Sequence, residues 1–496
     1  MRADRLLLAC HPVISVSIRR TRPRALALSI VVLLGASLGC ANAGAGRLAA
    51  GAYNAYAVDA DGSVWVWGAN VYGQICDGTT NHRYSPARIP GLVGVSSVTA
   101  GGSHGLARRQ DGSLASWGLN TQDSTGRGGG QLGDGTRINR ASPVGVLGAS
   151  AVVEVVAGSY HSMALQSDGS VLTWGFNQQS QLGDGSTQSR DIPAAIPGIS
   201  ALVALAGGCL HSLALKSDGS VLAWGFNSTG QLGDGTSTNR SAPVAVKGLS
   251  NVAAIAAGCA HSIALKKDGT VWAWGFNLEG QLGSITPAIM QRTPLQVGGL
   301  SGITAIAAGN DHNLALGADG RVWTWGKNDK GQLGDGSTAN RIMPTALAGL
   351  SSVAEVAAGQ SFSVALTRSG NIFGWGQNDF GQLGNGTTQN IASPTSSRDA
   401  SGAEFRLGMA SASTLTTDAD QVFAWAERTY PAFFAPPNPT TIDTVAGFLL
   451  RYYPGTVSYL GVNTTGIPHF YYLGPLSQDT VFDFGPLADW LARTTF

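Results

Sequence analysis

A tryptophan-glycine pair recurs along the chain at a nearly constant interval, and no other feature narrows the choice of fold as much. The seven tryptophans are Trp67, Trp117, Trp174, Trp224, Trp274, Trp325 and Trp375. Successive tryptophans are 50, 57, 50, 50, 51 and 50 residues apart. A period of this size indicates stacked supersecondary units, none of which can bury its apolar side alone. The chain therefore consists mainly of seven copies of one unit.

Each unit has the pattern of about four short β-strands. In the fifth unit, Asn251–Gly258 reads as an apolar inner strand, and HSIALKKDG alternates before a turn. The Asp-Gly pair suits a two-residue hairpin turn, TVWAWG alternates as the next strand, and a proline after the GQLG loop opens a fourth. Short strands repeated radially leave few exposed edges. We therefore predict an all-β fold, a seven-bladed β-propeller.

The repeated string resembles a known family. A-G-x-x-H-S-x-A-L-x-x-D-G-x-V-x-x-W-G-x-N-x-x-G-Q-L-G-D-G is similar to the regulator of chromosome condensation repeat, and the similarity extends from about Leu48 to Pro394. Families sharing this propeller include a nuclear guanine-nucleotide exchange factor, a plant ultraviolet receptor and a secreted bacterial inhibitor of β-lactamases. The resemblance therefore implies the fold, whereas function depends on surface residues.

Residues 1–43 have the composition of an export signal. Six arginines precede the apolar run Ala25–Gly39, which is too short to span a bilayer comfortably. Ala41-Asn42-Ala43 fits signal cleavage after Ala43, whereas Ser37-Leu38-Gly39-Cys40 resembles a lipoprotein box with the lipid on Cys40. Both alternatives predict an exported bacterial protein. We expect it to be extracellular or periplasmic, or an outer-membrane lipoprotein if Cys40 is modified.

The net charge argues against nucleic acid as a partner. Without residues 1–43 the chain has 25 basic and 29 acidic residues, a net charge of −4 in place of the formal +1. A slightly acidic body lacks the basic surface typical of nucleic-acid-binding proteins. We expect a monomer that needs no cofactor and contacts a membrane only through a lipid on Cys40.

The repeat fades after Pro394, and the composition changes. We place the propeller at 44–400, a linker at 401–418 and a small aromatic-rich α+β domain at 419–496. The expected elements of this domain are a helix at Ala419–Phe434, strands around FLLRYY, TVSYLGV, HFYYLG and TVFDFG, and a last helix PLADWLAR. The domain resembles a module of exported bacterial proteins. The alternative is an eighth half-repeat, since Trp425 lies 50 residues after Trp375.

Two units depart from the repeat in the loop that follows the tryptophan. The second unit has seven extra residues within Asn120–Gly130, which includes Asp123 and Arg127. The fifth unit reads GQLGSITPAIMQR and lacks the usual Asp-Gly. Irregular loops on a regular scaffold are common places for partner recognition, although a drifted solvent loop gives the same pattern.

A row of arginines follows the loop aspartates. Allowing for insertions, the arginines sixteen residues after the tryptophan are Arg83, Arg140, Arg190, Arg240, Arg292 and Arg341. The loop aspartates are Asp77, Asp134, Asp184, Asp234 and Asp335, with Ser284 and Asn385 in the remaining units. One carboxylate per loop is too few oxygens for calcium and suits turn capping. The arginines either pair with these aspartates or, together with Asp123 and Arg127, form a face that recognises an acidic partner.

Five histidines also recur, thirteen residues before the tryptophan, at His104, His161, His211, His261 and His312, with Asn54 and Phe362 in the other units. Zinc needs converging ligands, whereas each of these histidines lies on a different unit. We therefore expect hydrogen bonds to the backbone between blades, as the resembling family keeps a histidine there for packing. Cys209 and Cys259 share one register in neighbouring units, which leaves a disulfide or two small buried residues as alternatives.

These patterns favour a binding protein over an enzyme. The sequence has no Ser-His-Asp set, phosphate-binding glycine loop or HExxH motif. We expect an exported scaffold that presents propeller loops to a protein or a cell-surface partner. The alternatives are an enzyme with a site in the central depression, which requires converging acids and histidines, and a guanine-nucleotide exchange factor, which the resemblance alone suggests and export disfavours.

Overall fold

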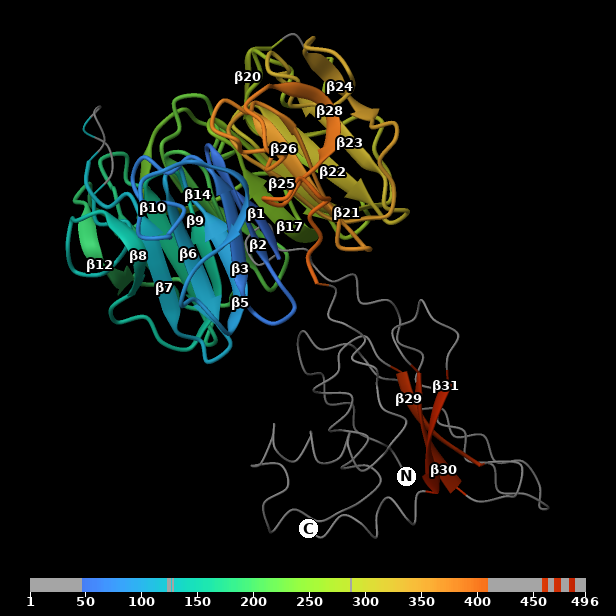
Figure 1. The fold of residues 1–496 in the computed structure, drawn as a ribbon. Coiled ribbons are helices and arrows are strands. Elements are labelled where there is room, and N and C mark those ends of the chain that lie inside the picture. Colours follow the sequence, from blue (N-terminus) through green and yellow to red (C-terminus); the bar gives the residue numbers. More distant parts are fainter. Residues whose placement is uncertain are drawn as a thin grey trace, which may run out of the picture. The chain divides into compact units, whose positions relative to one another are not determined.

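The computed structural model describes residues 47–122, 126, 129–285 and 288–408, together with the backbone of strands at 457–462, 468–473 and 481–486. Within residues 47–408, seven four-stranded sheets surround a common centre (Figure 1). Each sheet is an antiparallel meander of four consecutive strands, so the predicted seven-bladed propeller is confirmed. Within the described ranges the chain has no helix, and hence none long and apolar enough to cross a membrane.

The blades are numbered in chain order, and each runs from its inner strand to its outer edge. Blades one to four are β1 (Leu48–Ala50), β2 (Asn54–Val58), β3 (Val64–Gly68), β4 (Arg83–Arg88); β5 (Val95–Ala100), β6 (His104–Arg109), β7 (Leu114–Gly118), β8 (Arg140–Gly145); β9 (Val152–Ala157), β10 (His161–Gln166), β11 (Val171–Gly175), β12 (Arg190–Ala195); and β13 (Leu202–Gly207), β14 (His211–Lys216), β15 (Val221–Gly225), β16 (Arg240–Ala245). Blades five to seven are β17 (Val252–Ala257), β18 (His261–Lys266), β19 (Val271–Phe276), β20 (Met290–Gln296); β21 (Ile303–Ala308), β22 (His312–Gly317), β23 (Val322–Gly326), β24 (Arg341–Ala346); and β25 (Val353–Ala358), β26 (Phe362–Thr367), β27 (Ile372–Gly376), β28 (Ile391–Ser396).

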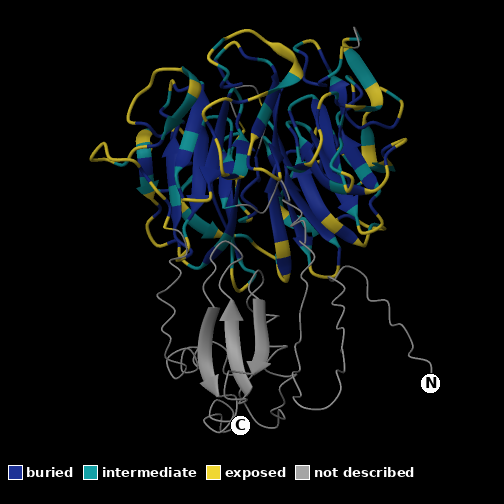
Figure 2. Cartoon of the chain, turned by 90° about the vertical axis from the view of Figure 1, so that its right-hand side faces the viewer, coloured by how far each residue is buried: buried dark blue, intermediate teal, exposed yellow. Residues whose placement is uncertain are grey.

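The motif tryptophans fill the spaces between blades, as expected. All seven are fully buried, and Figure 2 shows the buried strands as a dark blue interior with exposed residues mainly in the loops. Each indole Nε1 donates to the carbonyl of the GQLG-type glutamine in the preceding blade, at 2.8–3.1 Å. Burying an aromatic ring with its polar atom satisfied is strongly favourable. The repeat thus specifies the contact that holds neighbouring units together.

The hairpin between the second and third strands differs in detail from the prediction. In blade five, the Gly269 amide donates to the Lys266 carbonyl, so Lys267 and Asp268 are the central residues of the turn. Only Gly269 has a positive φ, of 81°, and Asp268 Oδ1 accepts the Thr270 amide. The connection is therefore a turn followed by a left-handed glycine, and the two-residue Asp-Gly turn was wrong.

The outer strands are protected against pairing with other chains. Each contains a proline at an edge position: Pro86, Pro143, Pro193, Pro243, Pro294, Pro344 and Pro394. Proline removes a backbone donor from a strand edge, which disfavours the addition of a further strand.

The ring closes where blade seven meets blade one, and the segment after β28 takes part in the closure. Phe405 and Leu407 are buried against residues of both blades, including Leu48 and Leu366. The Leu407 amide donates to the Gly370 carbonyl, the contact that the first residue of an inner strand makes at other seams. Leu407 therefore completes the short inner strand β1, although residues 401–408 lie where the sequence predicts a linker.

The C-terminal region contributes three described strands, β29 (Val457–Val462), β30 (Pro468–Leu473) and β31 (Val481–Pro486). They form one antiparallel sheet in the order β29-β30-β31. The expected helices at Ala419–Phe434 and PLADWLAR, the half-repeat around Trp425, and the export signal all lie outside the described residues.

Candidate functional site

The ring has two ends with different loops. At one end, here called the loop face, lie the turns between first and second strands and the long loops between third and fourth strands, such as 101–103 and 119–139. At the other end, the turn face, lie the short hairpin turns and the links between blades, such as 110–113 and 146–151. The six arginines of the predicted row, from Arg83 to Arg341, and the described parts of both irregular loops, belong to the loop face.

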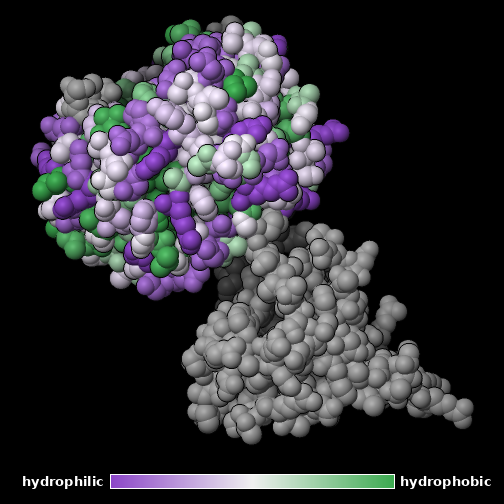
Figure 3. Space-filling model, in the orientation of Figure 1, coloured by the Kyte–Doolittle hydropathy of each residue, from purple (hydrophilic) through white to green (hydrophobic). Residues whose placement is uncertain are grey.

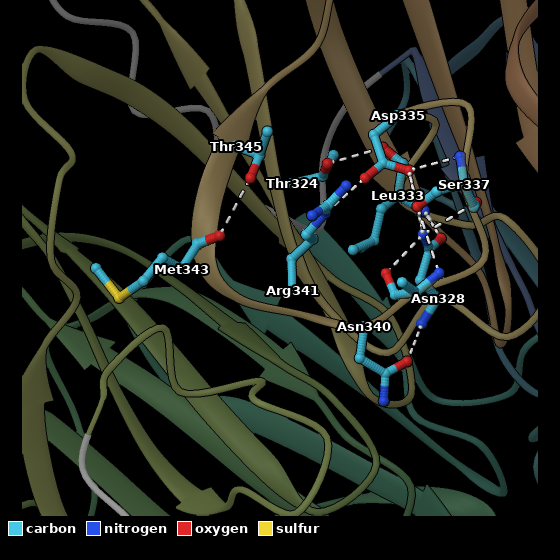
Figure 4. A network of polar contacts seen from close by, with 10 residues as sticks. Thr324, Asn328, Leu333, Asp335, Ser337, Asn340, Arg341, Met343 and Thr345 are labelled. Carbon is cyan, nitrogen blue, oxygen red and sulfur yellow. Dashed lines mark hydrogen bonds and ion pairs between the residues drawn. The ribbon is translucent and has the colours of Figure 1, made fainter.

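One network shapes the long loop of blade six (Figure 4). Asn328 accepts the Leu333 amide on Oδ1 and donates through Nδ2 to Asp335 Oδ1 and to the Ser337 carbonyl. Asp335 Oδ2 accepts Arg341 Nε at 2.7 Å. Burial acts to raise the pKa of Asp335, but the hydrogen bonds from Arg341 and Ser337 outweigh it and hold the pKa below its usual value. The carboxylate is therefore used to fix the loop.

The same arginine-aspartate pairing recurs in five blades. The pairs are Arg83–Asp77, Arg140–Asp134, Arg190–Asp184, Arg240–Asp234 and Arg341–Asp335, with closest approaches of 2.6–3.3 Å. Arg190 is the most enclosed, because it also donates to the carbonyl and the hydroxyl of Thr173. Blades five and seven lack both members: Ser284 and Gln291 take the two repeat positions in blade five, and Asn385 and Ile391 take them in blade seven. The pairing interpretation accounts for these arginines.

Arg292 does not belong to this row. Gly275 pairs with Gln291, whereas the corresponding glycines elsewhere pair with the row arginine, as Gly225 does with Arg240. The blade-five loop is one residue longer, so Gln291 takes the row position and Arg292 follows it, and successive side chains of a strand point to opposite sides. Arg292 Nε instead donates to Ser237 Oγ of blade four at 2.7 Å. Placing Arg292 in the row from the sequence was wrong.

Asp123 and Arg127, the candidates on the blade-two insertion, lie outside the described residues. The flanking scaffold is described and unchanged. Asn120 Nδ2 donates to Asp134 Oδ1, and the Gly130 amide donates to the Asn120 carbonyl. The insertion is therefore added to the loop network without replacing any part of it.

The five histidines join neighbouring blades through side chains and not through the backbone: four bond a serine hydroxyl, and His261 bonds Asn313 Oδ1. His161 Nε2 lies 2.9 Å from Ser212 Oγ of the next blade, and Ser212 donates to the Gln181 carbonyl. Because the hydroxyl proton is used there, His161 Nε2 must be the donor. Burial lowers the pKa of His161 to about 4 and that of His211 to about 3, so both rings are neutral near pH 7. Among the described residues no group of three His, Cys, Asp or Glu side chains is placed to hold a metal.

A small hollow opens at the centre of the loop face. It has a volume of about 80 Å³ and is lined by the ends of the inner strands and the turns that follow. None of the described residues lining it is acidic, basic or a histidine. Cys209, in its wall, forms a disulfide with Cys259 of the next blade, which settles the two alternatives left by the sequence, while Cys76 is a buried free thiol.

Sequence reasoning missed two buried carboxyls on inner strands. Glu154 accepts the Leu205 amide of blade four, and Glu355 accepts the Leu48 amide of blade one, each at 3.1 Å. Burial raises the pKa of Glu154 to about 8 and raises that of Glu355 as well. The available signal was an acid inside the otherwise apolar runs VVEVVAG and VAEVAAG.

Similarity to known proteins agrees with this architecture. The RCC1-like domain matches residues 124–427, and the regulator of chromosome condensation (RCC1) repeat matches 61–108 and, in a second form, 47–74 and 95–123. Prp20p from Saccharomyces cerevisiae, described with its binding properties to Gsp1p and histones, has a TM-score of 0.61 and 27% identity, covering 68% of this chain and 86% of Prp20p.

Two curated relatives are similar over shorter stretches. Protein pim1 of Schizosaccharomyces pombe is 30% identical over 140 residues, which are 25% of this chain and 26% of pim1. The probable E3 ubiquitin-protein ligase HERC3 of Homo sapiens is 34% identical over 134 residues, 26% of this chain and 12% of HERC3. The chain thus covers about a quarter or less of either relative. Because the RCC1-like domain matches more than half of the chain, the protein belongs to the RCC1-like domain family.

Proposed function

We propose that the protein is an exported binding scaffold that presents its loop face to a protein or cell-surface partner. The observation that carries this proposal is a contrast within that face. The Asn-Asp network holds most long loops in one conformation, while the loops of blades two and five depart from the repeat. A rigid frame with variable loops is a common arrangement for recognition.

The course of the chain also favours the loop face. Arg47 and Gly408, at the two ends of the described ring, meet through a hydrogen bond from Arg47 Nη2 to the Gly408 carbonyl. Leu407 contacts the hairpin turn at Gly370, so both chain ends leave the ring from the turn face. Arg47 and Gly408 therefore lie away from the loop face.

Two features support export. The apolar run Ala25–Gly39 after a basic segment has the pattern of a signal sequence. The Cys209–Cys259 disulfide is of the kind that persists in oxidising compartments and is rare in the cytosol. Fractionation of producing cells, with mass spectrometry of the mature N-terminus, distinguishes cleavage after Ala43 from lipidation of Cys40.

Affinity capture with the full-length protein tests the binding role. We compare the parent protein with a variant that lacks residues 123–129, which returns the blade-two loop to the length of its neighbours, and with the turn-face control Arg321→Ser. A partner from the extracellular or envelope fraction should be retained by the parent and the control, and reduced about tenfold or more by the deletion, with little change in Tm. A partner retained equally by these three proteins and by variants of the blade-five loop would contradict the proposal.

The alternatives receive less support. The central hollow has no acidic or basic side chain in its described lining, so nothing there favours an enzyme. The similarity to Prp20p, described with its binding to Gsp1p, is compatible with a protein partner. Nucleotide exchange on a GTPase becomes the better hypothesis if fractionation finds the full-length chain in the cytoplasm.

A further inference from the structure

Large apolar side chains gather on the loop face where blade five meets blade six. They are Leu278, Ile285 and Ile289 in the blade-five loop and Ile342 and Met343 in β24, here called the 5/6 patch, with exposed fractions of 64%, 84%, 58%, 53% and 37%. Leu147 and Ile192 form a smaller exposed pair near Gly135, and hydrophilic and apolar side chains are mixed across the view in Figure 3. A contiguous exposed apolar group of this kind marks an interaction surface.

The members of the patch are joined by close contacts. The Asn277 amide donates to the Ile289 carbonyl, which brings Ile289 beside Leu278. A Cβ added at Gly280 would lie 2.9 Å from Ile342 Cα, so β24 packs directly against the blade-five loop. A Cβ added at Gly298 would lie 2.7 Å from Met343 Cε, so Met343 lies against Gly298. The Gly298 amide donates to the Gly283 carbonyl, and Gly283 precedes Ser284 and Ile285 in the blade-five loop. In Figure 4 the Met343 side chain extends away from the Asn328–Asp335 network.

An acidic group borders the patch. Glu279 follows Leu278, and its Oε2 accepts Asn340 Nδ2 at 2.6 Å. Asp311 Oδ1 accepts Gln281 Nε2, and burial raises the pKa of Asp311. The charges of His261, Lys327, Glu279 and Asp329 are close enough to Asp311 to influence this pKa as well. Asp329 lies 3.6 Å from Lys327. Within the described residues Lys327 pairs with Asp329, whereas Glu279 is bonded to the Asn340 amide and not to a basic side chain, so its negative charge stays beside the apolar side chains.

This combination arises from the departure of blade five from the repeat. Ile342 directly follows Arg341, at a strand position taken by Ser241 in blade four and by Arg292 in blade five. Glu279 takes the loop position that Thr229 has in blade four. The aspartate-glycine pair of most other loops is Ser284-Ile285 here, so the chain exposes Ile285 instead of a glycine.

We propose that the 5/6 patch binds an extended segment of a partner protein in which apolar side chains alternate with lysine or arginine. The apolar side chains would cover Leu278 and Ile342, and the basic ones would face Glu279 and Asp329. Pro344 in β24 disfavours docking by strand addition, so side chains provide the recognition. A second copy of the chain fits less well, because a symmetric contact would bring the two acidic groups together. This inference rests on the proposed binding function and names the chemistry of its partner.

Fluorescence anisotropy with three labelled peptides of about ten residues, which span up to roughly 35 Å when extended, tests the inference on the full-length protein. The peptides contain alternating leucine and lysine, leucine and glutamate, or serine and lysine. The leucine-lysine peptide should bind at least about tenfold more tightly than the other two. Equal binding of all three peptides, or of none, would overturn the inference.

Three variants locate the binding. The double variant Leu278→Ser with Ile285→Ser should weaken the leucine-lysine peptide about tenfold. The double variant Glu279→Gln with Asp329→Asn should weaken binding of the leucine-lysine peptide about fivefold for each charge removed, and the affinity should depend less on salt. Val71→Ser, at the same loop position in blade one and 54% exposed, should leave it unchanged. Equal affinity of all variants for the peptide would overturn the inference. It would also be overturned if the parent protein binds no peptide but sediments as a dimer, and the double variant at Leu278 and Ile285 sediments as a monomer.

The same variants separate this inference from the proposed function. If a captured partner depends on residues 123–129 but not on the 5/6 patch, the inference fails and the binding function stands. If no captured partner depends on any loop-face residue, the proposed function fails with it.

Discussion

At the scale of single residues, one backbone carbonyl organises each seam between blades. The Gln231 carbonyl accepts both Trp274 Nε1 and Ser262 Oγ at 2.8 Å, and Ser262 in turn accepts His211 Nε2. Where the serine is absent, another group takes its place: Asn313 donates to the Gln281 carbonyl. At the closing seam both members of the pair are apolar, Phe362 and Ala55. Replacing both partners together avoids an unsatisfied buried group.

This pattern predicts non-additive substitutions at the seam between blades four and five. Ser262→Ala alone leaves the buried His211 Nε2 without an acceptor and should lower the free energy of unfolding by about 1–3 kcal/mol. The double variant His211→Phe with Ser262→Ala imitates the closing seam and should be less destabilised than the sum of its single variants. Urea unfolding of the four proteins measures the coupling, and strict additivity would show that the two side chains do not act as a pair.

The buried histidines also predict sensitivity to acid. Burial lowers the pKa of His104, His211 and His312 to about 3 and that of His161 to about 4, whereas the unfolded value is about 6.5. Below pH 6.5 the unfolded chain takes up protons that the folded chain excludes, so the free energy of unfolding falls as the pH falls toward 4. Each histidine contributes up to about 1.4 kcal/mol per pH unit.

Urea midpoints between pH 7 and pH 5 measure this effect. Glu154, whose pKa is raised to about 8, and Glu355, whose pKa burial also raises, oppose this effect, because each holds a proton in the folded form that the unfolded form releases. The double variant at His211 and Ser262 should have a slope shallower by about 1.4 kcal/mol per pH unit. A slope unchanged by that variant would exclude His211 as a source of the acid sensitivity.

At the scale of elements, the segment 405–407, here called the closing segment, takes the place of the first residues of an inner strand, which β1 lacks. Phe405 and Leu407 are 6% and 2% exposed, while Arg406 between them points outward with a side chain that is 60% exposed. Trp65 packs edge-on against Phe405 at 4.9 Å between ring centroids. The ring therefore depends on residues that follow the last repeat.

Substitutions in this segment test the closure. Phe405→Ala should lower the free energy of unfolding by about 3–5 kcal/mol and Leu407→Ala by about 2–5 kcal/mol, since each leaves a cavity at the seam. Arg406→Ala, on the exposed side of the same segment, is the matched control and should change it by less than about 0.5 kcal/mol. Equal effects of all three substitutions would mean that the segment does not close the ring.

The sequence was most informative where the repeat is regular. Seven tryptophans at a constant spacing are enough to predict the blades, because each occupies the same buried position between them. It was least informative where the repeat is interrupted. The register of Arg292 depends on how the blade-five loop folds, and the role of Phe405 depends on a contact with blade one that no local pattern encodes. The serine or asparagine partner of each histidine lies in the next blade, so spacing within one unit does not reveal it.

At the scale of the whole molecule, the ring separates two ends with different roles. Trp67 donates to the Gln382 carbonyl, so the contact that joins neighbouring blades also joins the last blade to the first. Both chain ends leave from the turn face, whereas the irregular loops, the central hollow and the 5/6 patch all lie on the loop face. Our central proposal is that partners of this RCC1-like protein approach the loop face outside the cytoplasm.

Site-specific photo-cross-linking of the full-length protein in its producing cells tests this claim most directly. The cross-linker replaces Val71 or Leu278 on the loop face and, as matched positions on the turn face, Val93 or Arg321, all of them well exposed. The account predicts that the loop-face positions form adducts with the same extracellular or envelope partner and that the turn-face positions do not. Adducts formed only from the turn face, or only with cytoplasmic proteins, would contradict it.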